Sequence, residues 1–222
     1  MSISVSIPNY TLKEEIISAG SHALGVGLAI SACVLAVVRS AGDLYLHGAI
    51  GVVSAAVYGA TMIMLYCMSS IYHALPRGDA KRVFRVIDHC SVFLLIAGTY
   101  TPYSLVSLRA AHPALGWSVF GVIWGLTAVG IVFNAIDVDR FQKVSAIINV
   151  IMGWMVVMTA RWLQPEIGHV GMSLLIWGGV VYSIGAILYA VGHRVRYAHS
   201  IFHFFVLGGS ILHFLSIYCT VL

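Results

Sequence analysis

The stretch HSIFHFFVLGGSILHFLSIYCT, residues 199–220, decides the fold of this chain. It contains no Asp, Glu, Lys or Arg, and about 20 largely apolar residues are enough for a helix to cross a membrane. Its histidines His199 and His203 are four residues apart, so a helix presents both imidazoles on one face, about one turn apart. Ionisable side chains on membrane helices usually have a function. The stretch therefore predicts a membrane span with a chemical role in its first turns.

The composition extends this prediction to the whole chain. Of its 222 residues, 60% are hydrophobic and 9% are charged, against about 25% charged in a soluble domain. The mean hydropathy is +0.95. We expect one integral membrane domain over residues 1–222 and no soluble domain. The net charge of +4 does not indicate a nucleic-acid partner, because the basic residues lie in short loops between apolar stretches.

Apolar stretches of spanning length predict an all-α bundle of seven transmembrane helices. They cover approximately residues 19–38, 47–72, 87–107, 115–134, 143–163, 170–191 and 199–220. Residues 1–18 lack the basic start and apolar core of a signal peptide, so the first span is expected to remain as an uncleaved anchor. Pro102 lies inside the third span and predicts a kink there.

The loops differ in their content of Lys and Arg. If the N-terminus and every second loop lie on one side, that side carries nine basic residues and the opposite side carries three, namely Arg39, Arg109 and Arg161. Cytoplasmic loops are enriched in Lys and Arg. The distribution predicts a cytoplasmic N-terminus and, with seven spans, a C-terminus outside.

This topology gathers further metal-ligand residue types at one depth. His73 ends the second span at a cytoplasmic loop, and Asp88 begins the third span after the same loop. His199 and His203 begin the seventh span after another cytoplasmic loop, and Ser69 lies one turn deeper than His73. Because the orientation was inferred from Lys and Arg alone, the common depth is an independent indication that these residues form one site.

Three imidazoles match the usual ligand set of catalytic zinc, which leaves one position open for water. Zinc can lower the pKa of such a water to about 7. We expect His73, His199 and His203 to bind the metal. Asp88 would act as general base or complete the coordination, and Ser69 would orient the water or donate to an oxyanion. Such a site suits hydrolysis of a lipid amide or ester at the cytoplasmic interface.

Each residue also has a simpler interpretation. The histidine pair can form hydrogen bonds between helices without a metal, Asp88 can cap its helix, and Ser69 can bond to its own backbone. His22 is more typical of an interfacial residue than of a site residue. His213 lies about 15 Å from His203 along a helix and is expected to pack or bond within the bundle. The four cysteines are scattered singly, which favours neither a thiolate site nor a redox motif.

The combination of motifs resembles the haemolysin III proteins, the bacterial branch of the progestin and adipoQ receptor family, from about residue 10 to 220. The motifs are Ser69-x-x-x-His73, Asp88 followed by LLIAGTYTP at 94–102, His199-x-x-x-His203, Glu15 with Ser21-His22, and His213-Phe214. The resemblance implies a seven-helix bundle with a cytoplasmic N-terminus. It also implies zinc near the cytoplasmic face on His73, His199 and His203, with Asp88 near the zinc-bound water and Ser69 as its polar partner.

The resemblance leaves three functions open. Adiponectin receptors of the same family are associated with ceramide hydrolysis, and the alkaline ceramidases share a similar pattern, which implies a zinc-dependent lipid hydrolase. A membrane sensor or regulator with structural zinc is the second hypothesis, and a pore-forming haemolysin is the third. In each case we expect a multi-pass protein of the bacterial inner membrane whose partners are membrane lipids.

Overall fold

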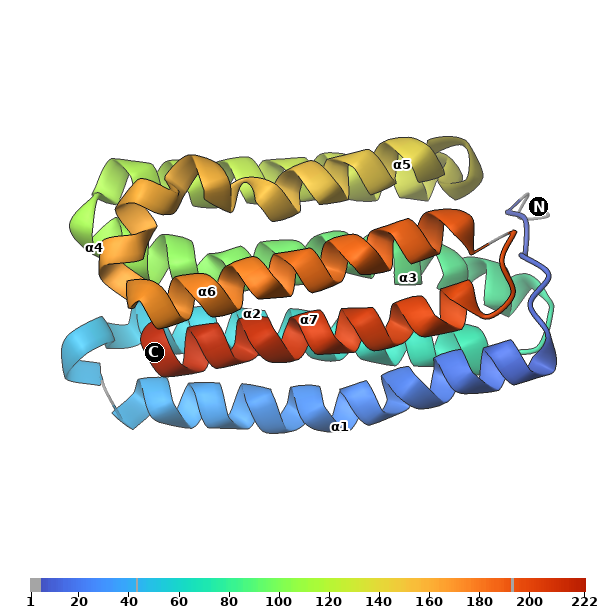
Figure 1. Ribbon diagram of the computed structural model, residues 1–222, viewed down its shortest axis with the longest axis horizontal. Coiled ribbons are helices and arrows are strands. Elements are labelled where there is room, and N and C mark those ends of the chain that lie inside the picture. Colours follow the sequence, from blue (N-terminus) through green and yellow to red (C-terminus); the bar gives the residue numbers. More distant parts are fainter. Residues whose placement is uncertain (1–4, 43, 193) are drawn as a thin grey trace.

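A computed structural model describes residues 5–42, 44–192 and 194–222, and all regular structure in these ranges is helical. The elements are α1 (Leu12–Gly42), α2 (Leu44–Ala74), α3 (Asp79–Pro102), the π-helix η1 (Tyr103–Leu108), α4 (Arg109–Ala111), α5 (Pro113–Trp154), α6 (Val156–Val191) and α7 (Ala198–Thr220). The long helices run roughly parallel to one common axis, and the two termini lie at opposite ends of the bundle (Figure 1). The predicted all-α membrane class is confirmed.

Five helical stretches among the described residues are long and apolar enough to cross a membrane. Three of them contain the predicted spans 19–38, 87–107 and 199–220, and the fourth, Gly48–Ala74, contains all but the first residue of the predicted span 47–72. The fifth, Pro113–Val191, has 79 residues and contains the other three predicted spans. A straight helix of that length would measure about 120 Å, four times the hydrocarbon thickness of a bilayer. The stretch must therefore bend back on itself.

Two backbone breaks divide this stretch. Asp137 has an extended backbone (φ −163°, ψ 98°), and its carboxylate accepts a hydrogen bond from the Arg140 N–H at 3.0 Å, as an N-cap does. Gly168 has φ +67°, a conformation that glycine reaches without strain, three residues after Pro165. Across the first break, Ser145 Oγ donates to Asn134 Oδ1 at 2.6 Å and joins the two halves of α5.

The third predicted span also changes its helical type. α3 ends at Pro102, and the backbone continues as the π-helix η1. Proline lacks the N–H that an α-helix needs, so a change of hydrogen-bonding pattern next to it is expected. Just before it, Gly98 packs so closely on Thr61 of α2 that a Cβ at this position would overlap the threonine side chain. This close contact sets α3 beside α2, the two helices that carry Asp88, Ser69 and His73.

Candidate metal centre

Three buried histidines meet at the end of the bundle that holds the N-terminus. His73 lies in the last turn of α2, and His199 and His203 lie in the first turns of α7. One ring nitrogen from each lies within 4.8 Å of the others. The Nε2 atom of His199 is 3.3 Å from Nε2 of His73 and 3.2 Å from Nε2 of His203. The predicted spacing thus brings the three imidazoles together, and this His triad can hold a metal ion.

Two of the distances within the His triad fit tetrahedral coordination. Zinc–nitrogen bonds of about 2.0–2.1 Å separate two ligands of a tetrahedron by about 3.3–3.4 Å. The two Nε2···Nε2 distances lie close to that value. Three converging lone pairs would repel one another without a shared proton or cation. The Nδ1 atoms of His199 and His203 have no hydrogen-bond partner among the described residues, so no neighbour directs their Nε2 atoms away from the triad.

His73 is oriented by a carboxylate from α1. Its Nδ1–H donates to Glu15 Oε2 at 2.7 Å, because a carboxylate only accepts. This bond leaves the Nε2 lone pair of His73 free to face the other two rings, as carboxylate partners of metal-binding histidines do. The second oxygen of Glu15 lies 2.8 Å from the buried Lys81 Nζ, which balances its charge. Lys81 also donates to the Leu75 carbonyl at 3.0 Å.

Two aromatic rings enclose the other histidines. Tyr10 stacks on His199 with ring centroids 4.6 Å apart and planes inclined by 14°. Burial is the main cause that raises the pKa of the Tyr10 phenol, so the ring stays neutral over the physiological range. His22 lies against His203 with centroids 3.9 Å apart, and both its ring nitrogens are buried without a partner. The interfacial interpretation of His22 is therefore wrong: it packs beside the triad.

The start of α7 is fixed by α1. Tyr197 precedes the helix in the left-handed conformation (φ +62°), which costs a non-glycine residue about 1–3 kcal/mol. Its backbone N–H donates to Glu14 Oε1 at 2.8 Å, and Ser200 Oγ donates to the Glu14 carbonyl at 3.1 Å. Glu14 thereby sets the position at which α7 begins, and with it the positions of His199 and His203.

Asp88 and Ser69 lie beside the triad rather than in it. Both line an internal cavity of about 220 Å³ that also reaches His199 and His203. Asp88 is partly buried, and its Oδ2 is 3.6 Å from Nδ1 of His89. The structure thus brings all five predicted residues to the same region, with the two oxygen-bearing side chains on the cavity wall.

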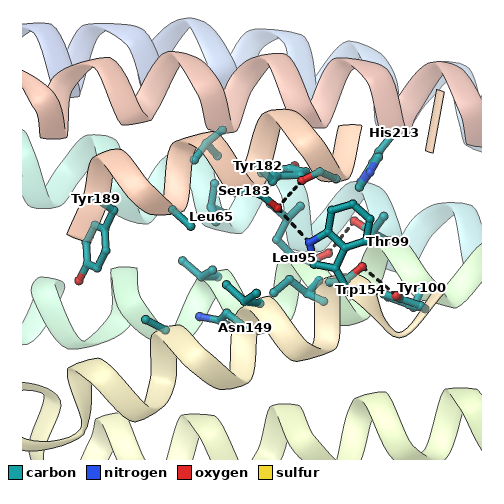
Figure 2. Close-up of a pocket in the computed structure, with 18 of the residues that line it drawn as sticks. Leu65, Leu95, Thr99, Tyr100, Asn149, Trp154, Tyr182, Ser183, Tyr189 and His213 are labelled. Atoms are coloured by element: carbon teal, nitrogen blue, oxygen red, sulfur yellow. Dashed lines mark hydrogen bonds between the residues drawn. The ribbon is translucent and has the colours of Figure 1, made fainter. Parts of the chain in front are cut away.

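The cavity is long and mostly apolar. Its wall follows α3 and η1 from Asp88 to Leu108, a length of about 30 Å. Side chains from several helices, among them Leu95, Asn149 and Trp154, gather around it (Figure 2). One end reaches the polar group around the triad, and the wall at the other end includes Leu108, Val119 and Leu163 beside Tyr103 and Ser104. Such a shape suits a molecule with a polar end and a long hydrocarbon chain.

Residues 5–11, which we call the N-terminal segment, cross the end of the bundle beside the triad. Asp139 accepts hydrogen bonds from the Ser6 N–H at 2.7 Å and from Ser6 Oγ at 2.8 Å. Arg85 donates to the Ser6 carbonyl at 2.8 Å and pairs with Asp139, and Arg77 donates to the Ile7 carbonyl at 2.9 Å. These contacts hold Tyr10 over His199.

Sequence reasoning predicted the triad but not the residues that orient it. Glu15, Ser18 and His22 recur at helical spacing on α1, a polar stripe on an apolar helix that signals a buried face. The sequence therefore contains a pattern from which the inward position of these three side chains could have been predicted. Tyr10 lies in a non-helical segment without periodicity, so nothing local predicted its contact with His199. His213 donates to the Leu175 carbonyl at 3.1 Å, which confirms that it bonds within the bundle.

Comparison with known proteins confirms the resemblance that the motifs indicated. Residues 10–214 match the family described as Haemolysin-III related. Hemolysin-3 of Bacillus cereus is 38% identical over 207 residues, 93% of this chain and 91% of that protein. The Hemolysin-3 homolog of Bacillus subtilis (strain 168) is 36% identical over 212 residues, 95% and 96% of the two chains. The monocyte to macrophage differentiation factor of Homo sapiens is 22% identical over 173 residues, 75% of this chain and 69% of that protein. This chain therefore belongs to the haemolysin-III related family.

Proposed function

We propose that this protein is a zinc-dependent hydrolase of lipid amide or ester bonds. The observation that carries the proposal is the opening of the long apolar cavity onto His199, His203, Asp88 and Ser69 together. A purely structural metal site needs no such cavity. The cavity places a hydrocarbon chain in an apolar environment and its polar end beside the triad, which is the arrangement that lipid hydrolysis requires.

The bundle is proposed to cross the bacterial inner membrane seven times with its N-terminus in the cytoplasm. The breaks at Asp137 and Gly168 divide Pro113–Val191 into three passages, which join four other spanning helices. An odd number of passages agrees with termini at opposite ends of the bundle (Figure 1). The excess of Lys and Arg on the side of the N-terminus supports the cytoplasmic orientation.

Each residue of the site has its own role in the proposed hydrolysis. His73, His199 and His203 would hold the metal through Nε2, with Glu15 fixing the tautomer of His73. Zinc bound there would supply Lewis-acid polarisation of the scissile carbonyl and a lowered pKa for a nearby water. The Asp88 carboxylate takes the proton of the attacking water and returns it to the leaving amine or alkoxide as the acyl bond breaks, and Ser69 Oγ–H donates to the carbonyl oxygen. The N-terminal segment limits the access of bulk water from the cytoplasmic end.

The test separates metal binding from turnover. Purified wild type and Asp88→Asn are incubated with a panel of N-acyl and ester lipids, and released fatty acid and bound metal are measured on the same samples. We expect Asp88→Asn to keep its zinc and to lose fatty-acid release by 100-fold or more, on the order of what a general base contributes. Asp79→Asn, an exposed carboxylate at the start of the same helix, is the matched control and should retain full activity. Unchanged release by Asp88→Asn would contradict the proposal.

Pore formation is the second candidate, favoured by the name Hemolysin-3 of the Bacillus cereus relative. A water-filled channel needs polar side chains along its length. Among the described residues, the buried acidic and basic side chains are Glu14, Lys81 and Arg85, all at the end of the bundle near the N-terminal segment. Dye leakage from liposomes at low protein concentration would favour this candidate, whereas the hydrolase leaves the vesicles sealed.

A further inference from the structure

A second polar group lies on the cavity wall, on α5 rather than on the helices of the triad. Gln142, Ser145 and Asn149 recur at helical spacing on the second half of α5, and all three line the cavity. Asn134, from the first half of α5, lines it as well. Polar side chains at membrane depth are costly and usually mark a binding site or a pathway.

Two fully buried amide atoms in this group have no hydrogen-bond partner among the described residues. Asn134 is 1% exposed, and its Oδ1 accepts from Ser145 Oγ at 2.6 Å, while its Nδ2 is buried and unpartnered. Asn149 has a buried, unpartnered Oδ1. Leaving a buried donor or acceptor unsatisfied is unfavourable, more so where no bulk water reaches it. The wall thus presents one buried free donor, Asn134 Nδ2, and one buried free acceptor, Asn149 Oδ1.

The neighbouring polar side chains do not satisfy these atoms. Gln142 Nε2 donates to the Tyr189 hydroxyl at 2.8 Å, and the same hydroxyl lies 3.1 Å from His89 Nε2. His89 Nδ1 donates to the Arg85 carbonyl at 2.8 Å, so its Nε2 accepts from Tyr189. Gln142 Nε2, the Tyr189 hydroxyl and His89 thus bond to one another and to Arg85, and not to the two asparagines. Asn134 and Asn149 are left as the groups that a bound molecule would contact.

We propose that Asn134 and Asn149 form a polar subsite that selects lipids with a hydrogen-bond donor as well as an acceptor near the polar end, the chemistry of a hydroxyl or an amide. Asn134 Nδ2 donates to the acceptor of the lipid, and Asn149 Oδ1 accepts from its donor. An ether or an ester offers acceptors only and leaves Asn149 Oδ1 unsatisfied. The proposal rests on the proposed use of the cavity for a lipid, but not on turnover.

Trp154 provides a local probe of occupancy. It lines the cavity beside this subsite on α5, and its Nε1–H donates to Ser183 Oγ at 2.9 Å. Bromine atoms on a hydrocarbon chain quench tryptophan fluorescence at short range. Three ligands with one dibrominated eighteen-carbon chain are titrated into the purified protein: the alcohol, its methyl ether and the primary amide. None contains an ester bond, and the amide titration is followed for released fatty acid so that only binding of the intact ligand is counted. The Trp154→Phe variant gives the signal of the other tryptophans for subtraction.

We expect wild type to bind the alcohol or the amide about 10-fold more tightly than the ether, the effect of one buried hydrogen bond. The tighter of the two identifies the group that the subsite recognises. Asn149→Leu should lose this preference while binding the ether as before, which also shows that the cavity is intact. Asn134→Leu should weaken all three ligands, since each has an acceptor. Gln164→Leu, which replaces an amide that does not line the cavity, should change nothing.

Equal binding of the three ligands by wild type would overturn the subsite, and so would a preference that persists in Asn149→Leu. Either result leaves the lipid cavity and the proposed hydrolase standing, because the ligands still quench Trp154. If no ligand quenches Trp154, the cavity does not hold a lipid chain. That result overturns the subsite and the lipid part of the proposed function together.

Discussion

The Glu15 carboxylate determines which nitrogen of His73 faces the triad. Its bond to Nδ1 is the only contact between a carboxylate and a triad imidazole among the described residues. Glu15→Ala is expected to lower zinc affinity by about 10- to 100-fold, the usual effect of losing such an orienting partner. Competition with a chromophoric zinc chelator measures the change. Glu166→Ala, an exposed carboxylate elsewhere in the chain, is the control. Equal affinities of the two variants would show that Glu15 does not orient His73.

At the residue scale, the sequence predicted what chemistry was present but not every contact. The i, i+4 spacing of His199 and His203 predicts a shared helix face, and the structure brings His73 to that face. The shared depth of Asp88 and Ser69 followed from loop charges, and both line the cavity. His22 was assigned to the interface because spacing within one helix cannot reveal that another helix brings His203 against it.

The N-terminal segment acts as an element of the site although it is not helical. Its main anchor is Asp139, which binds both the backbone and the side chain of Ser6. Asp139→Ala removes both hydrogen bonds to Ser6, of about 1 kcal/mol each, and the ion pair with Arg85, so Tyr10 should leave His199 more often. We expect a chelator to remove zinc about tenfold faster from this variant, while the equilibrium affinity changes little.

The control for that experiment is Asp79→Ala. Asp79 pairs with Arg82 in the first turn of α3 at the same end of the bundle, and the pair is exposed and contacts no residue of the N-terminal segment in the described interactions. Removing it changes the local charge by the same amount. If both variants release zinc at the wild-type rate, the N-terminal segment does not control access to the triad.

Helix ends were harder to predict than helix positions. The last predicted span, 199–220, differs from α7 by one residue at its start. The span predicted at 143–163 runs through the junction of α5 and α6, where Tyr100 accepts from the Val156 N–H at 2.8 Å and donates to the Gly153 carbonyl at 3.1 Å. That junction is stabilised by a residue more than 50 positions away, which hydropathy within a window cannot detect.

At the scale of the whole molecule, topology decides where the site opens. An alkaline phosphatase fused after Leu222 should be active, because the enzyme folds only outside the inner membrane and the C-terminus is predicted to lie there. The same fusion placed after Arg196, before α7, should be inactive. The opposite pattern of fusion activities would mean that the bundle has the inverse orientation in the membrane. The triad would then lie at the outer face, where a cytoplasmic lipid pool could not reach it.

The whole fold was more predictable than the whole function. Hydrophobic length and loop charge depend on one physical constraint, the bilayer, and they predict an all-helical membrane bundle directly. The cavity forms because side chains from distant helices, among them Leu65, Leu95 and Val206, leave a space unfilled. No local pattern encodes that space. The lipid substrate was inferred from the depth of the site residues and from the resemblance, but the cavity beside them was not predicted.

The central claim, that the His triad holds zinc, is tested most directly by elemental analysis of the purified protein. Wild type and His203→Ala are purified without added metal or chelator, and the zinc per chain is measured by mass spectrometry. His203→Ala leaves the two Nε2 atoms of His73 and His199 but removes the third ligand. We predict close to one zinc per wild-type chain and almost none in the variant. A wild type without zinc, or a variant with as much zinc as wild type, would contradict the account.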